Sequence, residues 1–525
     1  MPPSLPTPLS CDVLVVGGGI NGAGIARDLA GRGLQVLLCE QDDLARHTSS
    51  SSTKLIHGGL RYLEYYEFSL VRKALAERER LLRSAPHIMW PLRFVMPHDA
   101  SMRPVWMVRI GLFLYDHLAR REWLPASTTV DLRRHPVGAP LKPAYTRGFV
   151  YSDGWVDDAR LVVLNALDAA ARGAAILTRT RCESAQRTPK GWRARLQPLG
   201  GVACEVSARA LVNAAGPWTG EFLRDRAQVQ SARSLRLVKG SHIVVKKLFD
   251  HDHAYIFQNP DKRIIFAIPY EGDFTLVGTT DVEIDGAPDS ARIDAGETAY
   301  LCEQASRYFA RPVLPADVVW AYSGVRPLLD DASGDASAVT RDYLLEFDAA
   351  PGGPQDAPLL SVWGGKITTF RKLAEEAADA LVQRLGEARP AWTAPALLPG
   401  GDLSAWIGAP QRPDTDIARF IQALSLRHPA LPVPLLTRWA RAYGSRVDQL
   451  LGGRPLGREV APGLFEVELQ YLQQQEWARS ADDVLWRRSK LGLHYSAAQR
   501  QQVADWWASR YPEHPQQPAT AKPCN

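Results

Sequence analysis

The sequence has no apolar run long enough to span a bilayer. About 18 to 20 consecutive apolar residues are needed, and the nearest candidate, residues 104–118 (PVWMVRIGLFLYDHL), is shorter and contains Arg109. The first ten residues, MPPSLPTPLS, hold four prolines and lack the basic segment and apolar core of a signal peptide. We therefore expect a flexible leader over residues 1–10 and a protein that does not span a membrane.

Cysteine is scarce, and no charge sign dominates. The six cysteines in 525 residues form no C-x-x-C pair and no metal-ligand spacing, so we predict reduced cysteines and no metal site, as in a cytoplasmic protein. The net charge of +5 gives no nucleic-acid-binding signature. With 46% apolar and 23% charged residues, the chain is typical of a globular protein, and its length predicts two or three domains.

Residues 12–40 fit a dinucleotide-binding pattern. An apolar strand segment precedes a G-x-G-x-x-G turn, a helical pattern follows, and a second strand segment ends on the acid Glu40. The glycines permit the tight turn, the approach of a pyrophosphate and close helix packing. The helix N-terminus offers N–H groups to the phosphates, and the acid binds the ribose. This stretch alone leaves NAD and FAD equally open. Its predicted contacts are Gly17, Gly19, Ile20, Asn21, Gly22, Glu40 and Gln41.

A hydroxyl-rich segment at 48–53 follows and leads into HGGLR at 57–61. A polar loop with a helix cap would have the same composition. However, the segment directly follows the second strand, where a dinucleotide continues across the sheet edge. We predict cofactor contacts at Thr48, Ser49, Ser50, Ser52, Lys54, His57, Gly58 and Gly59. Arg61 should begin a helix, and the run ERER at 77–80 should form its solvated face.

Two later segments complete the predicted nucleotide fold. The strand pattern ALVNAAG at 210–216 ends in the small residues Ala215 and Gly216, which leave room for a ligand and should face the dinucleotide. The stretch LLSVWGGKITTFR at 359–371 repeats the order of strand, glycines and helix. The nucleotide domain is therefore predicted to be discontinuous, with its closing strand far from its opening strand in sequence.

The remaining segments predict two other bodies. Residues 240–320 are β-rich and predict an antiparallel sheet, and residues 235–245 predict a strand pair centred on KGSH. Apolar residues at i+4 spacing over 106–118 predict a buried helix, with a membrane-surface helix as the alternative. Helical periodicity prevails from about residue 403, and Ser496 and Gln499 have capping-box spacing. The tail after 512 is polar and rich in proline.

Motifs along nearly the whole chain resemble the FAD-dependent (aerobic, respiratory) glycerol-3-phosphate dehydrogenases. They are GGGINGAGIARDLAGRGL, SSTKLIHGGLRYLEYYEF, YSDGWVDDARL, VNAAGPW, LVKGSHIVV, YSGVRPL, TRDY, WGGKITTFRKLAEEA and ADDVLWRRSKLG. The resemblance implies an α/β fold of the glutathione-reductase/D-amino-acid-oxidase type. Its implied parts are a discontinuous Rossmann-like FAD-binding domain (11–85, 145–235 and 320–388), a β-rich substrate-binding cap domain (86–144 and 236–319), a linker (389–400), an all-helical C-terminal domain (401–511) and a flexible tail (512–525).

The resemblance also implies an activity. The family oxidises sn-glycerol 3-phosphate to dihydroxyacetone phosphate with non-covalent FAD and passes electrons to membrane quinone. A homodimer at the cytoplasmic face of the cell membrane, with no nucleic-acid partner, is implied as well. The alternatives are a glycerol-phosphate oxidase that uses oxygen and an amine or amino-acid flavin oxidase. A flavin-binding RNA module is a third alternative, which the near-neutral charge does not support.

Site roles follow from the same motifs. Arginine forks suit a phosphate dianion, so Arg61, Arg326 and Arg341 are the implied substrate clamps. His242 is the first candidate for the base that takes the hydroxyl proton, and His57 is the second. A purely structural His242 is the alternative, and Arg326 could share the role by lowering the pKa of the alcohol. Lys366 should lie near the flavin ring and substrate, with cofactor contacts also from Gly365, Ile367 and Thr368. His47 receives no role.

Overall fold

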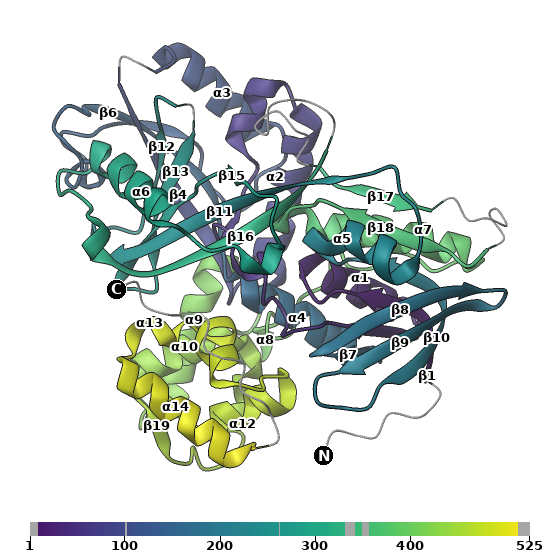
Figure 1. Ribbon diagram of the computed structural model, residues 1–525. Helices are drawn as coiled ribbons and strands as arrows, with labels where there is room; N and C mark the ends of the chain where they lie inside the picture. Colours follow the sequence, from purple (N-terminus) through teal and green to yellow (C-terminus); the bar gives the residue numbers. More distant parts are fainter. Residues whose placement is uncertain (1–8, 100–101, 262, 331–341, 349–355, 513–525) are drawn as a thin grey trace.

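The computed structural model of the chain describes residues 9–99, 102–261, 263–330, 342–348 and 356–512. These residues form an α/β body built on one sheet, a β-rich body built on a second sheet, and a helical C-terminal region that lies beneath both (Figure 1). Within the described residues, every helix is too short or too polar to traverse a bilayer.

The first sheet is the predicted nucleotide fold. β1 lies at its centre and pairs in parallel with β2 and β10, and β18 pairs in parallel with β10. Val13, Leu14 and Val15 of β1 are fully buried, because helices cover one face and the β8–β9 hairpin covers the other. The strands are β1 (Leu9–Val16), β2 (Val36–Cys39), β7 (Ala175–Leu177), β8 (Thr180–Thr188), β9 (Gly191–Pro198), β10 (Cys204–Asn213), β17 (Leu344–Phe347) and β18 (Leu359–Trp363).

Three helices pack on one face of this sheet: α1 (Ile20–Gly31), α4 (Asp158–Ala171) and α7 (Phe370–Arg384). A side chain at Gly24 of α1 would collide with Phe370 of α7, so the two helices approach closely. The pairing of β18 with β10 confirms that the nucleotide fold is discontinuous and closes near residue 360. The short helix α5 (Thr219–Glu221) follows β10.

The second sheet has ten strands among the described residues and forms the β-rich body. The predicted strand pair at 235–245 is wrong, because one continuous strand, β11, runs through KGSH and pairs with β14 on one side and β16 on the other. β3, β6 and most of β16 fall within the ranges 11–85, 145–235 and 320–388 of the predicted FAD-binding domain, yet they pair in this sheet. The strands are β3 (Leu55–Ile56), β4 (Met89–His98), β5 (Thr128–Asp131), β6 (Arg147–Val156), β11 (Leu235–Lys246), β12 (Ala254–Gln258), β13 (Ile264–Tyr270), β14 (Phe274–Gly278), β15 (Val282–Glu283) and β16 (Val318–Leu329).

The helices of the β-rich body correct three expectations. Arg61 lies in a 3-10 turn (Leu60–Tyr65), and the long helix α2 (Phe68–Ser84) begins only after it. Residues 77–79 of the predicted solvated face are buried on α2. Glu77 and Arg78 pair with charged residues of other elements, and Glu79 accepts the N–H groups of Glu122 and Trp123. The helix at 106–118, α3 (Val105–His117), is not buried. It lies at the outer end of the molecule (Figure 1), and several of its large apolar side chains are exposed. α6 (Ala295–Tyr308) covers the opposite part of the sheet.

The C-terminal region is helical, as predicted, apart from the small hairpin of β19 (Glu459–Ala461) and β20 (Leu464–Phe465). The predicted capping box at Ser496 and Gln499 is confirmed at the start of α14. The predicted linker is packed against the first body, since Trp392 donates to the carbonyl of Asp28 at 3.0 Å. The helices are α8 (Ser404–Ile407), α9 (Pro413–Arg427), α10 (Val433–Tyr443), α11 (Asp448–Leu451), α12 (Glu466–Gln475), α13 (Leu491–His494) and α14 (Ala497–Arg510), with a π turn, η11 (Asp483–Arg488).

Candidate active site

The glycine turn after β1 has the geometry that a dinucleotide requires. Gly17 has φ +111°, and its N–H donates to the carbonyl of Cys39 at 2.9 Å. A side chain at Gly22 would overlap the carbonyl of Gly17, and one at Gly17 would overlap the carbonyl of Ala214. The turn is therefore closed to side chains on its protein side. The first N–H groups of α1, which lack intrahelical partners, begin at its edge.

Glu40 closes this turn from the end of β2. Its carboxylate accepts the N–H of Gly18 at 2.6 Å and the N–H of Asp42 at 2.8 Å. Burial raises the pKa of Glu40. The predicted ribose ligand is therefore held beside the glycine turn, while its neighbour Gln41 is exposed.

The hydroxyl-rich segment joins the two sheets. Ser49 accepts the N–H of Ile20 at 2.9 Å, and Thr48 donates to the carbonyl of Val325 on β16 at 2.7 Å. Ser52 and Lys54 both bind Asp158, at 2.7 and 2.8 Å. Burial lowers the pKa of Lys54. Ser52 and Lys54 therefore hold the segment in place, and Lys54 also donates to the carbonyl of Ser50 at 3.0 Å.

The GGKIT turn after β18 meets both glycine segments. Asn21 of α1 donates to the carbonyl of Gly364 at 3.2 Å, and a side chain at Gly365 would crowd Asn21. The N–H of His57 donates to the hydroxyl of Thr368 at 3.2 Å. The structure thus brings three predicted cofactor segments together. Ile367 lies in this turn as well, and the ammonium of Lys366 lies 3.9 Å from the ring centre of Tyr62.

Ala215 and Gly216 lie at the end of β10, next to Ala214, which contacts the glycine turn. A side chain at Gly216 would meet no atom within 4 Å, so this strand end is open. The Trp218 ring that follows lies 4.7 Å from the ring of His47, and His47 is paired with Asp42 at 2.9 Å. Glu40, Asp42 and His47 have their ligand atoms within 4.8 Å of one another, but the contacts above already occupy them, and we assign no metal there.

His242 is buried in the middle of β11. Its ring stacks on Tyr322 of β16 at 4.8 Å, and its Nε2 lies 3.0 Å from the hydroxyl of Thr53. Its Nδ1 is buried and has no hydrogen-bond partner among the described residues. Burial, together with the charges of Arg326 and Lys54, holds the pKa of His242 well below its usual range, so the imidazole is neutral at pH 7.

The structure describes two of the three predicted arginine clamps. Arg326 lies on β16, where it pairs with Asp281 and donates to the hydroxyl of Thr279 at 3.0 Å. Its guanidinium also lies against Gly240, where any side chain would collide with it. Arg61 contacts Tyr65 of its own turn, at 3.3 Å. Arg341 lies outside the described residues.

A buried polar group behind the site was missed from the sequence. The N–H of Gly58 donates to the hydroxyl of Tyr115 at 2.8 Å, and Tyr115 donates to Asp153 at 2.7 Å. Arg78 binds the same carboxylate at 2.7 Å, and Glu77 of the same run pairs with Arg371. The run ERER resembled a solvated face because the charged partners of Glu77 and Arg78 lie on other elements, so no local signal marked it as buried.

Fold and site together define an oxidoreductase that binds a dinucleotide between an α/β body and a β-rich body. The model of the family described as FAD dependent oxidoreductase matches residues 12–371. The glycerol-3-phosphate dehydrogenase of Pseudomonas aeruginosa is 52% identical over 98% of each chain. The D-erythritol 1-phosphate dehydrogenase of Brucella abortus is 49% identical, over 95% of this chain and 98% of its own.

A solved structure agrees with these relatives. The glycerol-3-phosphate dehydrogenase of Bacillus halodurans complexed with FAD superposes with a TM-score of 0.76 at 28% identity, covering 96% of this chain and 91% of that one. The chain belongs to the FAD-dependent oxidoreductases, in their glycerol-3-phosphate dehydrogenase family. Its cofactor is FAD, which the glycine turn, Glu40 and the GGKIT turn fit in shape and chemistry.

Proposed function

We propose that this enzyme oxidises sn-glycerol 3-phosphate to dihydroxyacetone phosphate, with bound FAD as the hydride acceptor. The observation that carries the proposal is the direct bonding of the cofactor segment 48–53 to the strands of the second sheet. Thr48 binds the carbonyl next to Arg326, and Thr53 binds His242. A cation for the phosphate and a neutral base for the hydroxyl therefore lie where the cofactor segment meets the second sheet.

Each residue has a defined task in this proposal. Arg326, with Arg61 and Arg341, binds the phosphate dianion through guanidinium forks. His242, whose Nε2 lies beside the hydroxyl of Thr53, takes the hydroxyl proton, and His57 is the alternative base. Lys366 adds positive charge near the cofactor. FAD, when bound, supplies the hydride acceptor.

Anaerobic bleaching of the bound flavin tests the substrate. Glycerol 3-phosphate should bleach it, whereas glycerol and lactate, which lack the phosphate, should not. D-erythritol 1-phosphate is the second candidate, because a relative of similar identity carries that name. Faster bleaching by the erythritol phosphate would reassign the substrate, and bleaching by glycerol alone would refute the role of the arginines.

We also propose that the electrons pass to membrane quinone and that α3 contacts the bilayer. Trp106, Ile110 and Phe113, on α3, are exposed by 61%, 51% and 60%. Apolar side chains that recur along an exposed helix are typical of an interfacial helix. Tyr66, just after the 3-10 turn (Leu60–Tyr65), is 80% exposed as well. From the family resemblance we also propose that the enzyme binds the cytoplasmic face of the membrane and forms a homodimer. Sedimentation of the purified enzyme tests the dimer.

Liposome flotation tests the membrane contact. The double change Ile110→Glu with Phe113→Glu should abolish flotation with anionic liposomes and leave flavin content unchanged. The matched control is Leu426→Glu with Val433→Glu, which alters two exposed apolar residues of the C-terminal region and should float normally. Equal flotation of both variants would refute α3 as the contact. Turnover with a soluble quinone analogue, compared with hydrogen peroxide yield, separates the dehydrogenase from an oxidase.

A further inference from the structure

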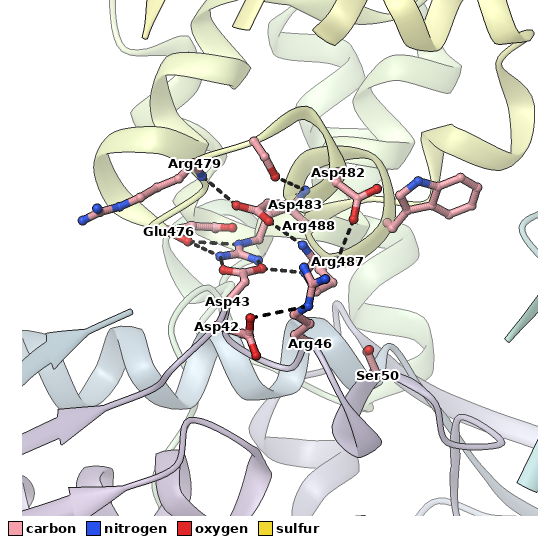
Figure 2. A network of polar contacts seen from close by, with 12 residues as sticks. Asp42, Asp43, Arg46, Ser50, Glu476, Arg479, Asp482, Asp483, Arg487 and Arg488 are labelled. Atoms are coloured by element: carbon pink, nitrogen blue, oxygen red, sulfur yellow. Dashed lines mark hydrogen bonds and ion pairs between the residues drawn. The ribbon is translucent and has the colours of Figure 1, made fainter. Parts of the chain in front are cut away.

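The C-terminal helical region reaches the site through η11. Figure 2 shows this turn above the loop that follows β2, with Arg487 and Arg488 directed at Asp43. Both arginines belong to the motif ADDVLWRRSKLG of the predicted helical domain. The contacts of η11 fall into two groups, one toward the FAD loop and one toward His242.

The first group fixes a buried carboxylate. The side chain of Asp43 has no exposed surface and accepts from Arg488 at 2.7 and 2.8 Å and from Arg487 at 2.6 Å. Arg487 also pairs with Asp483, which in turn binds Arg179 at 2.7 Å. A buried charge paired in this way loses its compensation when one partner is removed. The position of Asp43 therefore depends on η11.

Asp43 lies three residues after Glu40 in the chain. Between them, the N–H of Asp42 donates to the carboxylate of Glu40 at 2.8 Å, and the side chain of Asp42 pairs with His47. This short loop has little freedom once both ends are held. The arginines of η11 therefore also determine where the carboxylate of Glu40 lies against the glycine turn.

The second group is a series of stacked rings. Trp486 of η11 stacks on Trp320 of β16 at 4.7 Å with an interplanar angle of 18°. Trp320 lies 5.0 Å from Tyr322, and Tyr322 stacks on His242 at 4.8 Å and 15°. Tyr322 also donates to the carbonyl of Ser52 at 2.8 Å. The series thus connects the C-terminal region with the proposed base.

We propose that Trp486, Arg487 and Arg488 are positioning residues of the FAD-dependent reaction. The two arginines hold the loop that binds the adenosine end of FAD. Trp486 holds the ring series that sets the orientation of His242, and this half rests on the proposed function. The C-terminal region then completes the active site from outside both sheets.

FAD retention tests the arginine half. Arg487→Lys keeps the charge but loses the fork that binds Asp43 and Asp483, and should raise the dissociation constant of FAD about tenfold, as measured by flavin fluorescence on dilution. The matched control is Arg438→Lys, which breaks a comparable fork to Glu468 within the C-terminal region. Equal FAD retention by the two variants would overturn this half. If Arg487→Lys does not fold, Asp43→Asn is measured in the same assay. Weaker FAD retention than in Arg438→Lys would support this half, and equal retention would overturn it.

Anaerobic stopped-flow reduction tests the tryptophan half. Trp486→Leu should keep its flavin but reduce it about tenfold more slowly at saturating glycerol 3-phosphate, because small displacements of a reacting group are costly. Trp486→Phe should restore most of the rate. The control Trp406→Leu removes a half-buried ring that contacts Phe420 and should react normally. A wild-type rate in Trp486→Leu would overturn this half. An unreactive wild type would instead refute the proposed function, and the FAD measurement would still decide the arginine half.

Discussion

The hydroxyl of Tyr115 offers the sharpest test of how the loop at 57–59 is supported. Burial raises the pKa of Tyr115 well above its usual value, so the hydroxyl is protonated. It donates to Asp153 and accepts the N–H of Gly58. Tyr115→Phe removes both interactions and changes no other atom of the side chain.

The size of the stability loss in Tyr115→Phe depends on the hydrogen bonds that Gly58 and Asp153 keep. Gly58 keeps only a longer contact with Asp153, at 3.3 Å, and Asp153 keeps Arg78. Leaving a buried donor poorly satisfied costs about 1–3 kcal/mol. We expect a loss of that size in stability, measured as a lower temperature of flavin release. We also expect slower flavin reduction, because Gly58 adjoins His57, whose N–H binds Thr368 beside Lys366.

Tyr270→Phe is the matched control. The hydroxyl of Tyr270 is buried in the same hydrophobic cluster but has no hydrogen-bond partner among the described residues. Its removal should leave stability unchanged or slightly higher, since a buried unpaired hydroxyl is unfavourable. If both variants release flavin at the same temperature and reduce it at the same rate, the reasoning about Tyr115 is wrong.

Four further outcomes are expected. Gly22→Ala should abolish FAD binding, since its side chain would overlap Gly17; a flavin-loaded variant would contradict the geometry of the turn. Arg326→Ala should raise the KM for substrate at least tenfold with flavin content unchanged, and loss of flavin would make Arg326 structural. His242→Ala should slow flavin reduction about 100-fold or more, and an unchanged rate would remove it as the base. Burial and the charges of Arg160 and Arg441 lower the pKa of His87 to about 3. As the pH falls, His87 is therefore protonated in the unfolded chain before it is protonated in the folded one. The free energy of unfolding should fall by up to about 1.4 kcal/mol per pH unit below pH 6.5. The free energy of unfolding of His87→Leu should lack this dependence on pH. An unaltered pH dependence would contradict the lowered pKa of His87.

Local spacing explains why the nucleotide fold was predictable. The glycine turn, the strand at 210–216 and the GGKIT turn each combine strand, glycine and helix signals within about 30 residues. The contact that excludes a side chain at Gly22 is local as well, since it involves Gly17. The parallel pairing of β1, β10 and β18 agrees with the predicted discontinuous fold. His242 and Arg326 were found by motif, and β11 and β16 place them on adjacent strands.

Burial and long-range pairing were not predictable in the same way. The i+4 apolar spacing of α3 is identical for a helix that faces a core and one that faces outward, so only the packing showed that Trp106 and Phe113 are exposed. Glu77 and Arg78 are charged residues that the sequence places on a solvated face. Only the structure shows that they are buried and paired with Arg371 and Asp153.

The sequence by itself determined that a dinucleotide binds, that the nucleotide fold is discontinuous and which residue types form the site, because short motifs carry those signals. The tertiary structure alone decided that Asp43 is neutralised by arginines more than 440 residues away. It also decided that the ring of Trp486 lies in series with His242. Such contacts depend on how the two sheets and the C-terminal region pack together, and no local pattern records that packing.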